Sequence, residues 1–346
     1  MLSREHDPRE SRLGDKTSTV RSRDARFQQW QALLANRRKR QQAGEFLVQG
    51  VRPITLAVQH GWPLRALIYD ADRSLSSWAR ETIQKAQAAP VAMATELITE
   101  LGEKPDDPPE LVAVAAIPAD DLDRITVADD FLGLAFDRPT SPGNIGTLIR
   151  SADAFGASGL IVTGHAADPY DPKSVRASTG SLFAVPVVRT ASATDVLTWA
   201  NSQHVAMVGT DENGTADIAD YDLTRPALLV IGNETTGLSA AWRDACDAMV
   251  RIPITGSASS LNAANAGTIA LYEAARQRHG AGACLDANSL GSIRSRLWDS
   301  PSRSRWRIWK RIRILPMPGC AGKRRSASFR RSACGSSPGT RTLSRW

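Results

Sequence analysis

The sequence predicts an α/β protein built from two α/β domains in succession. Three observations lead to this fold class. Short apolar runs alternate with segments of helical periodicity, and an Asp-rich stretch at residues 119–128 divides that alternation into two parts. The length of 346 residues suits two domains, and a hydrophobic content of 42% supports a sizeable core.

The first α/β domain is expected over residues 23–118, after a polar arm at residues 1–22 that we expect to be disordered and basic. A helix is predicted from Asp24, because Phe27, Trp30 and Leu33 recur on one helical face. The following elements alternate as a strand at 45–49, a helix at 53–60, a strand at 64–69, a helix at 75–88 and a strand at 111–117. This order is typical of a three-layer domain, and residues 119–128 form the expected linker to the next one.

The second domain is expected over residues 129–282. It opens with a short apolar run at residues 131–136, which is typical of a buried parallel strand. A helix is expected from about Asn144, since the apolar positions after it fit a period of about 3.6 residues. Later apolar runs predict strands at 160–162, 205–208, 227–231 and 251–254, and a terminal helix at 261–279.

Charge is distributed unevenly along the chain. The net charge is +7, but residues 285–346 hold 15 Lys and Arg against 2 Asp and Glu, and residues 1–43 hold 11 against 5. The body between them is acidic, with 17 basic against 29 acidic residues. A polyanion must therefore be bound by local patches, and the candidate patch is the run Arg37, Arg38, Lys39 and Arg40. A solvated helix end is the alternative interpretation of that run.

The tail at residues 283–346 is basic, rich in Arg, Ser and Trp, and has no helical or strand period longer than a turn. We expect it to be disordered. Two interpretations stay open: an extension that is not under selection, or an RNA-binding tail.

Several classes of protein are not expected. No apolar run reaches the roughly 18 residues of a membrane span, and residues 1–24 lack the apolar core of a secretion signal. We therefore expect a cytoplasmic protein with no membrane partner. The cysteines, Cys246, Cys284, Cys320 and Cys334, have neither CxxC spacing nor paired histidines nearby, so no disulfide framework and no metal site are expected.

The helix expected from Asn144 carries two polar residues with different requirements. Asn144 stands where its side chain could cap the helix, which is the structural explanation for an isolated asparagine. Arg150 is expected to interrupt an apolar helix face between Ile149 and Ala152, so its guanidinium needs a partner. Either a carboxylate or a phosphate would satisfy it.

A second polar segment, residues 232–234, follows directly on the strand predicted at 227–231. Open α/β sheets bind ligands at such strand ends. Glu234 could accept a hydrogen bond from a ligand or from Arg150.

A third segment joins a flexible loop at residues 256–260 to the terminal helix. Ser260, Leu261 and Asn262 lead into first turns made almost entirely of small residues, so something must pack very close to that helix. A strand or a second subunit is one explanation, and a bound cofactor is the other.

Together, in this order and at these separations, residues 144–150, 231–237 and 252–262 resemble the motifs of the SpoU (TrmH-type) family of SPOUT RNA 2′-O-ribose methyltransferases. This resemblance covers about residues 130–280, and residues 176–183 also resemble a loop and helix of the family. Residues 24–118 resemble its L30e-like substrate-binding domain. Residues 25–34 and 136–144 most resemble the family's 23S rRNA methyltransferases that confer avilamycin resistance.

The resemblance implies a trefoil knot at the C-terminal end of the second domain, although chains as a rule do not thread loops. It also implies S-adenosylmethionine as the cofactor, bound in the knot, and a homodimer whose active sites straddle the subunits. The residues implied to bind the cofactor are Gly209, Thr210, Ile231, Gly232, Ile252, Ile254 and Leu261.

The implied reaction transfers the sulfonium methyl group to a ribose 2′-hydroxyl without a metal. The residues implied at the catalytic centre are Arg150, Asn144, Glu234, Ser260 and Asn262. Because a guanidinium is very hard to deprotonate, we expect Arg150 to bind the adjacent phosphate and polarise the hydroxyl. The proton would pass to a phosphate oxygen or to a transiently neutral arginine. Asn144 would position the ribose or Arg150, and the remaining three residues would order the site.

The expected substrate is 23S rRNA, with phosphate contacts from residues 37–40 and with ribosome-targeted antibiotic resistance as a candidate role. A tRNA ribose methyltransferase and a catalytically silent RNA-binding assembly factor are the alternatives. A dinucleotide-binding oxidoreductase would need GxGxxG after its first strand and an acidic residue about 20 positions later, and no such pair is present.

Overall fold

The computed structural model describes residues 18–102 and 108–285, with side chains described as far as residue 279. Most of the predicted N-terminal arm, at residues 1–17, and the predicted tail beyond residue 285 lie outside the described residues. None of the helices in the described part is long and apolar enough to cross a bilayer.

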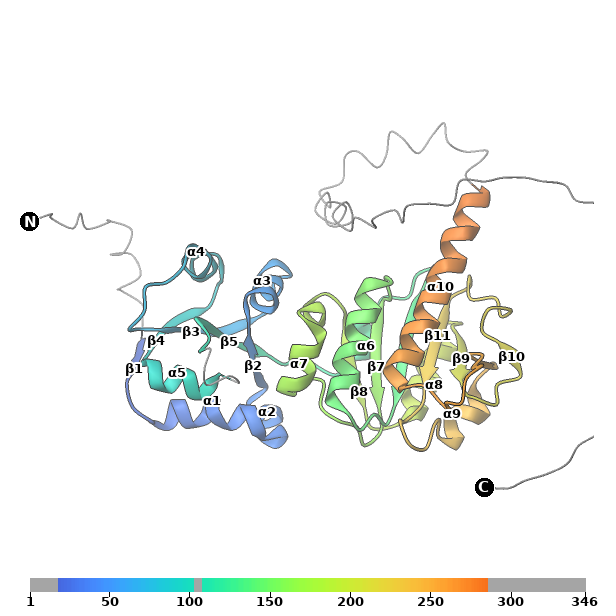
Figure 1. Ribbon diagram of the computed structural model, residues 1–346, viewed down its shortest axis with the longest axis horizontal. Helices are drawn as coiled ribbons and strands as arrows, with labels where there is room; N and C mark the ends of the chain where they lie inside the picture. Colours follow the sequence, from blue (N-terminus) through green and yellow to red (C-terminus); the bar gives the residue numbers. More distant parts are fainter. Residues whose placement is uncertain (1–17, 103–107, 286–346) are drawn as a thin grey trace, which may run out of the picture. The chain divides into compact units, whose positions relative to one another are not determined.

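The first domain contains a five-stranded sheet in the order β1-β4-β3-β5-β2 (Figure 1). Strands β1, β4 and β3 are parallel, and β5 runs antiparallel to both β3 and β2. Its strands are β1 (Ser18–Val20), β2 (Glu45–Gln49), β3 (Leu64–Asp70), β4 (Ala89–Met93) and β5 (Leu111–Ala116). Its helices are α1 (Ala25–Ala35), α2 (Arg37–Ala43), α3 (Val51–Gln59), α4 (Ser77–Lys85) and α5 (Thr95–Leu101).

Helix α1 follows the sequence prediction closely. Asp24 caps it by accepting a hydrogen bond from the Phe27 N–H at 2.9 Å. Phe27, Trp30 and Leu33 are buried and share a core cluster with residues of α5 such as Ile98. Helices α3 and α4 contribute to a separate core cluster, so the predicted three-layer arrangement agrees with the packing.

The second domain contains a seven-stranded, entirely parallel sheet in the order β10-β12-β9-β11-β6-β7-β8. The strands are β6 (Leu132–Asp137), β7 (Gly159–Thr163), β8 (Val187–Thr190), β9 (Ala206–Thr210), β10 (Ala216–Asp217), β11 (Ala227–Ile231) and β12 (Ala248–Arg251). The helices are α6 (Pro142–Ala154), α7 (Pro172–Ser178), α8 (Ala193–Ser202), α9 (Ala240–Ala245) and α10 (Ala263–Leu285), with a 3-10 turn η3 (Ser181–Phe183).

Helices α6 and α10 lie side by side over one face of this sheet (Figure 1). The Ser151 and Thr268 hydroxyls bond across the pair at 2.7 Å. Helix α7 packs on α6 at Gly146, where an added Cβ would clash with the Ser174 carbonyl oxygen and lie 2.8 Å from Ala177 Cβ. The glycine therefore permits a very close helix contact within the segment that carries Asn144 and Arg150.

Some predicted element boundaries need correction. Residues 18–20 belong to the domain as the edge strand β1, not to a disordered arm, and they pair with β4. The strand predicted at 251–254 instead ends at Arg251, since Pro253 has no N–H for a sheet hydrogen bond. The expected linker is also packed, because it contains a 3-10 turn, η2 (Leu122–Arg124), and Ile125 is buried against Gly159.

Candidate functional site

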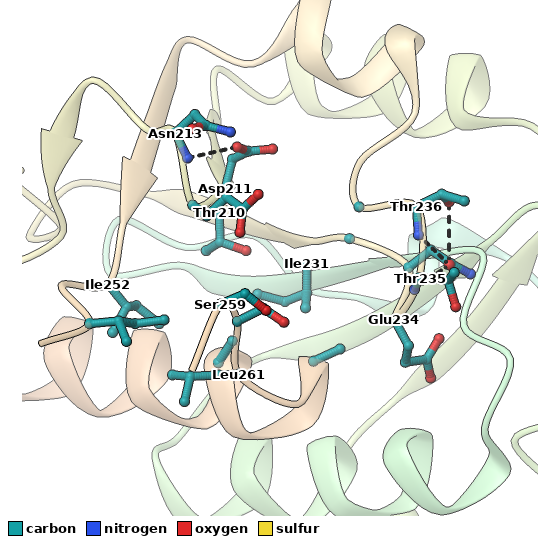
Figure 2. Close-up of a pocket in the computed structure, with 18 of the residues that line it drawn as sticks. Thr210, Asp211, Asn213, Ile231, Glu234, Thr235, Thr236, Ile252, Ser259 and Leu261 are labelled. Atoms are coloured by element: carbon teal, nitrogen blue, oxygen red, sulfur yellow. Dashed lines mark hydrogen bonds between the residues drawn. The ribbon is translucent and has the colours of Figure 1, made fainter. Parts of the chain in front are cut away.

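The carboxyl ends of four adjacent parallel strands, β12, β9, β11 and β6, lie at one edge of the sheet. The loops that leave the first three of these strands line a cavity of about 510 Å³. Figure 2 shows side chains of Thr210, Ile231, Ile252 and Leu261 around one space, although these residues come from different loops. Such a meeting of loops is the usual ligand site of an open α/β sheet.

The residues expected to bind the cofactor lie at this cavity with one exception. Its lining includes Thr210, Ile231, Gly232, Ile252, Ile254 and Leu261. The exception is Gly209, which does not line the cavity. An added Cβ there would lie 2.6 Å from Met249 Sδ and 3.1 Å from Cys246 Sγ, so its small size serves packing behind the strand.

Glu234 accepts four hydrogen bonds from the start of α6. Its donors are the Thr140 N–H at 3.0 Å, the Thr140 hydroxyl at 3.1 Å, the Ser141 N–H at 3.2 Å and Asn144 Nδ2 at 2.9 Å. Partial burial by itself would raise the pKa of Glu234, but the bonds from Thr140, Asn144 and Ser141 outweigh it and lower the pKa. The carboxylate therefore stays ionised and holds the two loops together. It does not pair with Arg150, which was one of the predicted options.

Asn144 does not cap its helix, as an isolated asparagine would be expected to do. Ser141 is the cap residue, and its hydroxyl accepts from the Asn144 N–H at 3.4 Å. The Asn144 side chain instead donates to Glu234 and accepts from Asn262 Nδ2 at 3.2 Å. Since Glu234 takes the amide nitrogen, the carbonyl oxygen of Asn144 is left to face Asn262.

Asn262 also organises the start of α10. Its carbonyl oxygen Oδ1 accepts from the Ala264 N–H at 3.0 Å and from the Asn265 N–H at 3.3 Å. The chain Glu234–Asn144–Asn262 thus joins the three sequence segments singled out above. Ser260, just before it, is exposed and lines the cavity.

Arg150 occupies a different face of α6. Six residues turn an α-helix by about 600°, which leaves its side chain about 120° away from that of Asn144. Arg150 is exposed, while Ile149 and Ala152 are buried, so it does not interrupt the apolar face. Among the described residues it has no hydrogen-bond or ion-pair partner, and it does not line the cavity. The carboxylate partner considered from the sequence is therefore absent from this part of the chain.

Sequence reasoning missed one wall of the cavity. Asp211, Glu212 and Asn213 follow β9 and line it, with Asp211 Oδ1 accepting from the Asn213 N–H at 2.9 Å (Figure 2). A polar run directly after an apolar strand was the available signal. Arg243 also lines the cavity, although its guanidinium donates to the Leu238 carbonyl oxygen at 2.7 and 2.9 Å.

The basic run divides into two classes of residue. Arg38 and Lys39 are exposed, as a phosphate contact requires. Arg37 donates to the Ala166 carbonyl oxygen. Arg40 is only 1% exposed, and it pairs with Asp168 at 2.8 Å and with Asp171 at 3.3 Å. The prediction that Arg40 contacts RNA is therefore wrong, because its guanidinium is buried against carboxylates and cannot reach a phosphate.

Two regions of the chain match known protein families. Residues 132–272 match the SpoU rRNA Methylase family, and residues 24–113 match the SpoU L30e-like domain.

Similar proteins and structures agree with both matches. The 23S rRNA (uridine(2479)-2′-O)-methyltransferase of Streptomyces viridochromogenes is 63% identical over 273 residues, covering 77% of this chain and 95% of that protein. The crystal structure of the SpoU methyltransferase AviRb from the same species, in complex with the cofactor AdoMet, is 64% identical with a TM-score of 0.72, and the match covers 74% of this chain and 99% of that one. An AdoMet-bound rRNA methyltransferase from Sinorhizobium meliloti is 30% identical with a TM-score of 0.69, covering 75% and 98%.

Proposed function

This chain belongs to the SpoU rRNA methylase family and is an RNA 2′-O-ribose methyltransferase that uses S-adenosylmethionine, and from this premise we propose that its substrate is 23S rRNA. The predicted SPOUT fold, with an L30e-like domain before it, is confirmed. The observation that carries the proposal for the site is the chain Glu234–Asn144–Asn262 beside the cavity.

The cavity fits the cofactor in size and in chemistry. Its volume of about 510 Å³ lies within the usual range for small-molecule sites. Ile254 and Leu261 are each 38% exposed there, and exposed apolar side chains at a cavity indicate a ligand with an apolar face. Bound S-adenosylmethionine supplies the methyl group on its sulfonium. Ile231, Ile252 and Leu261 would enclose its adenine, while Thr210 and Asp211 offer oxygens to its hydroxyl and ammonium groups.

Glu234 acts as a positioning residue in this account. Four donors already occupy its carboxylate and its pKa is lowered, so it is a poor proton acceptor at neutral pH. It fixes the amide of Asn144, which in turn fixes Asn262 at the start of α10. These hydrogen bonds are how Glu234 and Asn262 would order the site, as expected from the sequence.

Arg150 binds the phosphate next to the target ribose and polarises the 2′-hydroxyl. An exposed guanidinium with no protein partner in the described residues suits a phosphate, which it can bind through two parallel hydrogen bonds. A phosphate oxygen beside the guanidinium would then accept the proton that the 2′-hydroxyl loses, since arginine is a poor base.

A homodimer would bring Arg150 of one subunit to the cavity of its partner. Arg150 lies on α6 outside the cavity of its own subunit. The same helix pair presents apolar side chains to solvent: Ile269 is 38% exposed, and Tyr272 is 55% exposed with its ring edge-on to Phe155 at 5.9 Å. An exposed apolar patch on these helices supports an interface between two copies of the chain.

Of the four expected phosphate contacts, we keep Arg38 and Lys39. Arg40 is excluded because it is buried, and Arg37 is left out because its guanidinium already donates to the Ala166 carbonyl oxygen. Replacing Arg38 and Lys39 with Ala should weaken binding of a 23S rRNA transcript and reduce the salt dependence of that binding. An unchanged salt slope would exclude the pair from the RNA-binding surface.

The substrate assignment is tested by tritiated methyl transfer to transcripts of 23S rRNA, 16S rRNA and tRNA. We expect transfer to 23S rRNA only, with loss of transfer in Arg150→Ala. Arg225→Ala is the matched control, because Arg225 is an exposed arginine of the same domain with an 82% exposed side chain. Transfer to tRNA would favour the tRNA enzyme, and transfer to none of the RNAs would favour the assembly factor. The resistance role is tested by expressing the protein in a bacterium that avilamycin kills and measuring whether the cells are protected.

An rRNA substrate also implies that the protein acts in the cytoplasm.

A further inference from the structure

A second cavity, of about 400 Å³, shares no lining residue with the first. Its walls include Val51, Arg73 and Trp78 from the first domain, and Pro172, Val175 and Arg176 from α7. We refer to it as the Trp78 cavity. None of the residues assigned to catalysis or cofactor binding lines this cavity.

The Trp78 cavity offers apolar surface. The Trp78 indole N–H is already bonded to the Thr55 hydroxyl at 2.9 Å, so its ring presents apolar surface to a ligand. Val51 is 58% exposed, the highest value among the large hydrophobic residues of the described chain. Pro172 and Val175 complete a wall that could hold a flat aromatic group.

Among the described residues that line the Trp78 cavity, the charged side chain that is free to meet a ligand is positive. Glu110 lines it, but its carboxylate accepts from the Ser76 hydroxyl at 2.8 Å and from the Ser76 N–H, and so is tied to the cap of α4. Arg73 is exposed and has no hydrogen-bond or ion-pair partner among the described residues. Arg176 lines the cavity as well, but it already has a partner and is not counted as a free charge. Aromatic surface beside arginine is the combination that binds a nucleobase together with its phosphate.

The Trp78 cavity also lies close to the catalytic helix. Helix α7, which provides Val175 and Arg176, touches α6 at Gly146 through the Ser174 carbonyl. Packed helices are about 8–10 Å apart between their axes. A nucleotide held there would therefore be near, but not at, the ribose that Arg150 engages.

We propose that the Trp78 cavity receives an unpaired nucleobase of the substrate RNA, close in sequence to the methylated nucleotide. The base stacks on Trp78, and Arg73 binds its phosphate. This inference rests on the proposed function, because the ligand is the RNA substrate. It adds a second place, besides the catalytic site, where the protein would contact that RNA.

Val51→Glu tests the proposal with little risk to folding. Val51 is exposed at the start of α3, where an acidic residue favours the helix, but the new carboxylate would repel RNA from the Trp78 cavity. Thr194→Glu is the matched control, since it adds the same charge to the first turn of α8 at an exposed position. In filter binding with a 23S rRNA transcript, Val51→Glu should raise Kd at least about tenfold. Thr194→Glu should leave it within about twofold. Equal Kd values for the two variants would overturn the proposal.

Trp78→Ala and Trp78→Phe test the stacking itself. Loss of one base–aromatic stack should raise Kd for the transcript roughly fivefold to a hundredfold, and Phe should restore most of the affinity. Ultraviolet crosslinking followed by peptide mapping should place RNA on the peptide that contains Trp78. No crosslink there, with an unchanged Kd in a folded Trp78→Ala protein, would contradict the proposal. Because neither measurement needs methyl transfer, RNA binding without transfer would refute the proposed activity while leaving this site intact.

Discussion

Replacing Arg40 with alanine should destabilise the fold far more than replacing any other member of the basic run. The change leaves Asp168, whose side chain is 3% exposed, without its 2.8 Å partner, and leaves the Leu33 carbonyl oxygen without a 2.7 Å donor. Removing one member of a buried ion pair costs about 3–5 kcal/mol, because the other charge stays buried and unpaired. Asp168 keeps a 3.1 Å bond from the Tyr170 N–H and a 3.8 Å approach of Arg189, which favours the lower end of about 3 kcal/mol.

Thermal unfolding followed by circular dichroism measures this loss. For two domains that unfold together as one unit, a change of about 3 kcal/mol corresponds to a fall in Tm of roughly 6–12 °C. Arg38→Ala, on the same helix but exposed, should stay within about 0.5 kcal/mol of the wild type. The double variant Arg40→Ala/Asp168→Ala should recover part of the loss, because no unpaired charge is then buried. A Tm for Arg40→Ala within the range of Arg38→Ala would refute the reasoning.

Three further predictions concern the site and the subunit contact. Glu234→Gln should lower the free energy of unfolding at neutral pH. Because folding lowers the pKa of Glu234 below 4.5, the stability difference between wild type and variant should be constant above that pH. It should shrink as the pH falls below about 4.5, where the carboxylate becomes protonated. A difference that grows in acid would contradict this. Gly146→Ala should cost about 1–3 kcal/mol or more in urea unfolding, because its Cβ would meet the α7 backbone, whereas Gly143→Ala on the same helix, 3.6 Å from its nearest neighbour, should be neutral or slightly stabilising. If the proposed homodimer forms through α6 and α10, Tyr272→Asp should lower its molar mass in light scattering to that of a monomer, and a dimer that is unchanged by the substitution would contradict that interface.

The elements with a clear local pattern could be predicted from the sequence. The 3.6-residue period predicted the buried face of α6, and the spacing of Phe27, Trp30 and Leu33 predicted α1. The edge strand β1 carries no comparable signal, because three residues show no period and its pairing partner lies some 70 positions away.

The side-chain assignments failed where the deciding contact is distant in sequence. Four consecutive basic residues look alike, but only Arg40 meets carboxylates at 168 and 171. Asn144 was predicted as a cap, but the helix begins earlier, at Pro142, and Ser141 caps it. The Asn144 side chain instead bonds to Glu234 and Asn262, which come from other loops. Hydrogen-bond partners across such separations depend on the assembled sheet and not on local spacing.

A mixing experiment tests the division of labour between Arg150 and the cofactor cavity most directly. Arg150→Ala should bind S-adenosylmethionine but transfer no methyl group, and Leu261→Asp should fail to bind the cofactor, so each variant alone is inactive. If Arg150 of one subunit serves the cavity of its partner, co-refolding equal amounts of the two should restore roughly a quarter of wild-type transfer to 23S rRNA, because half of the dimers then contain one complete site. No activity in the mixture, with heterodimers demonstrated by mass spectrometry, would contradict the account.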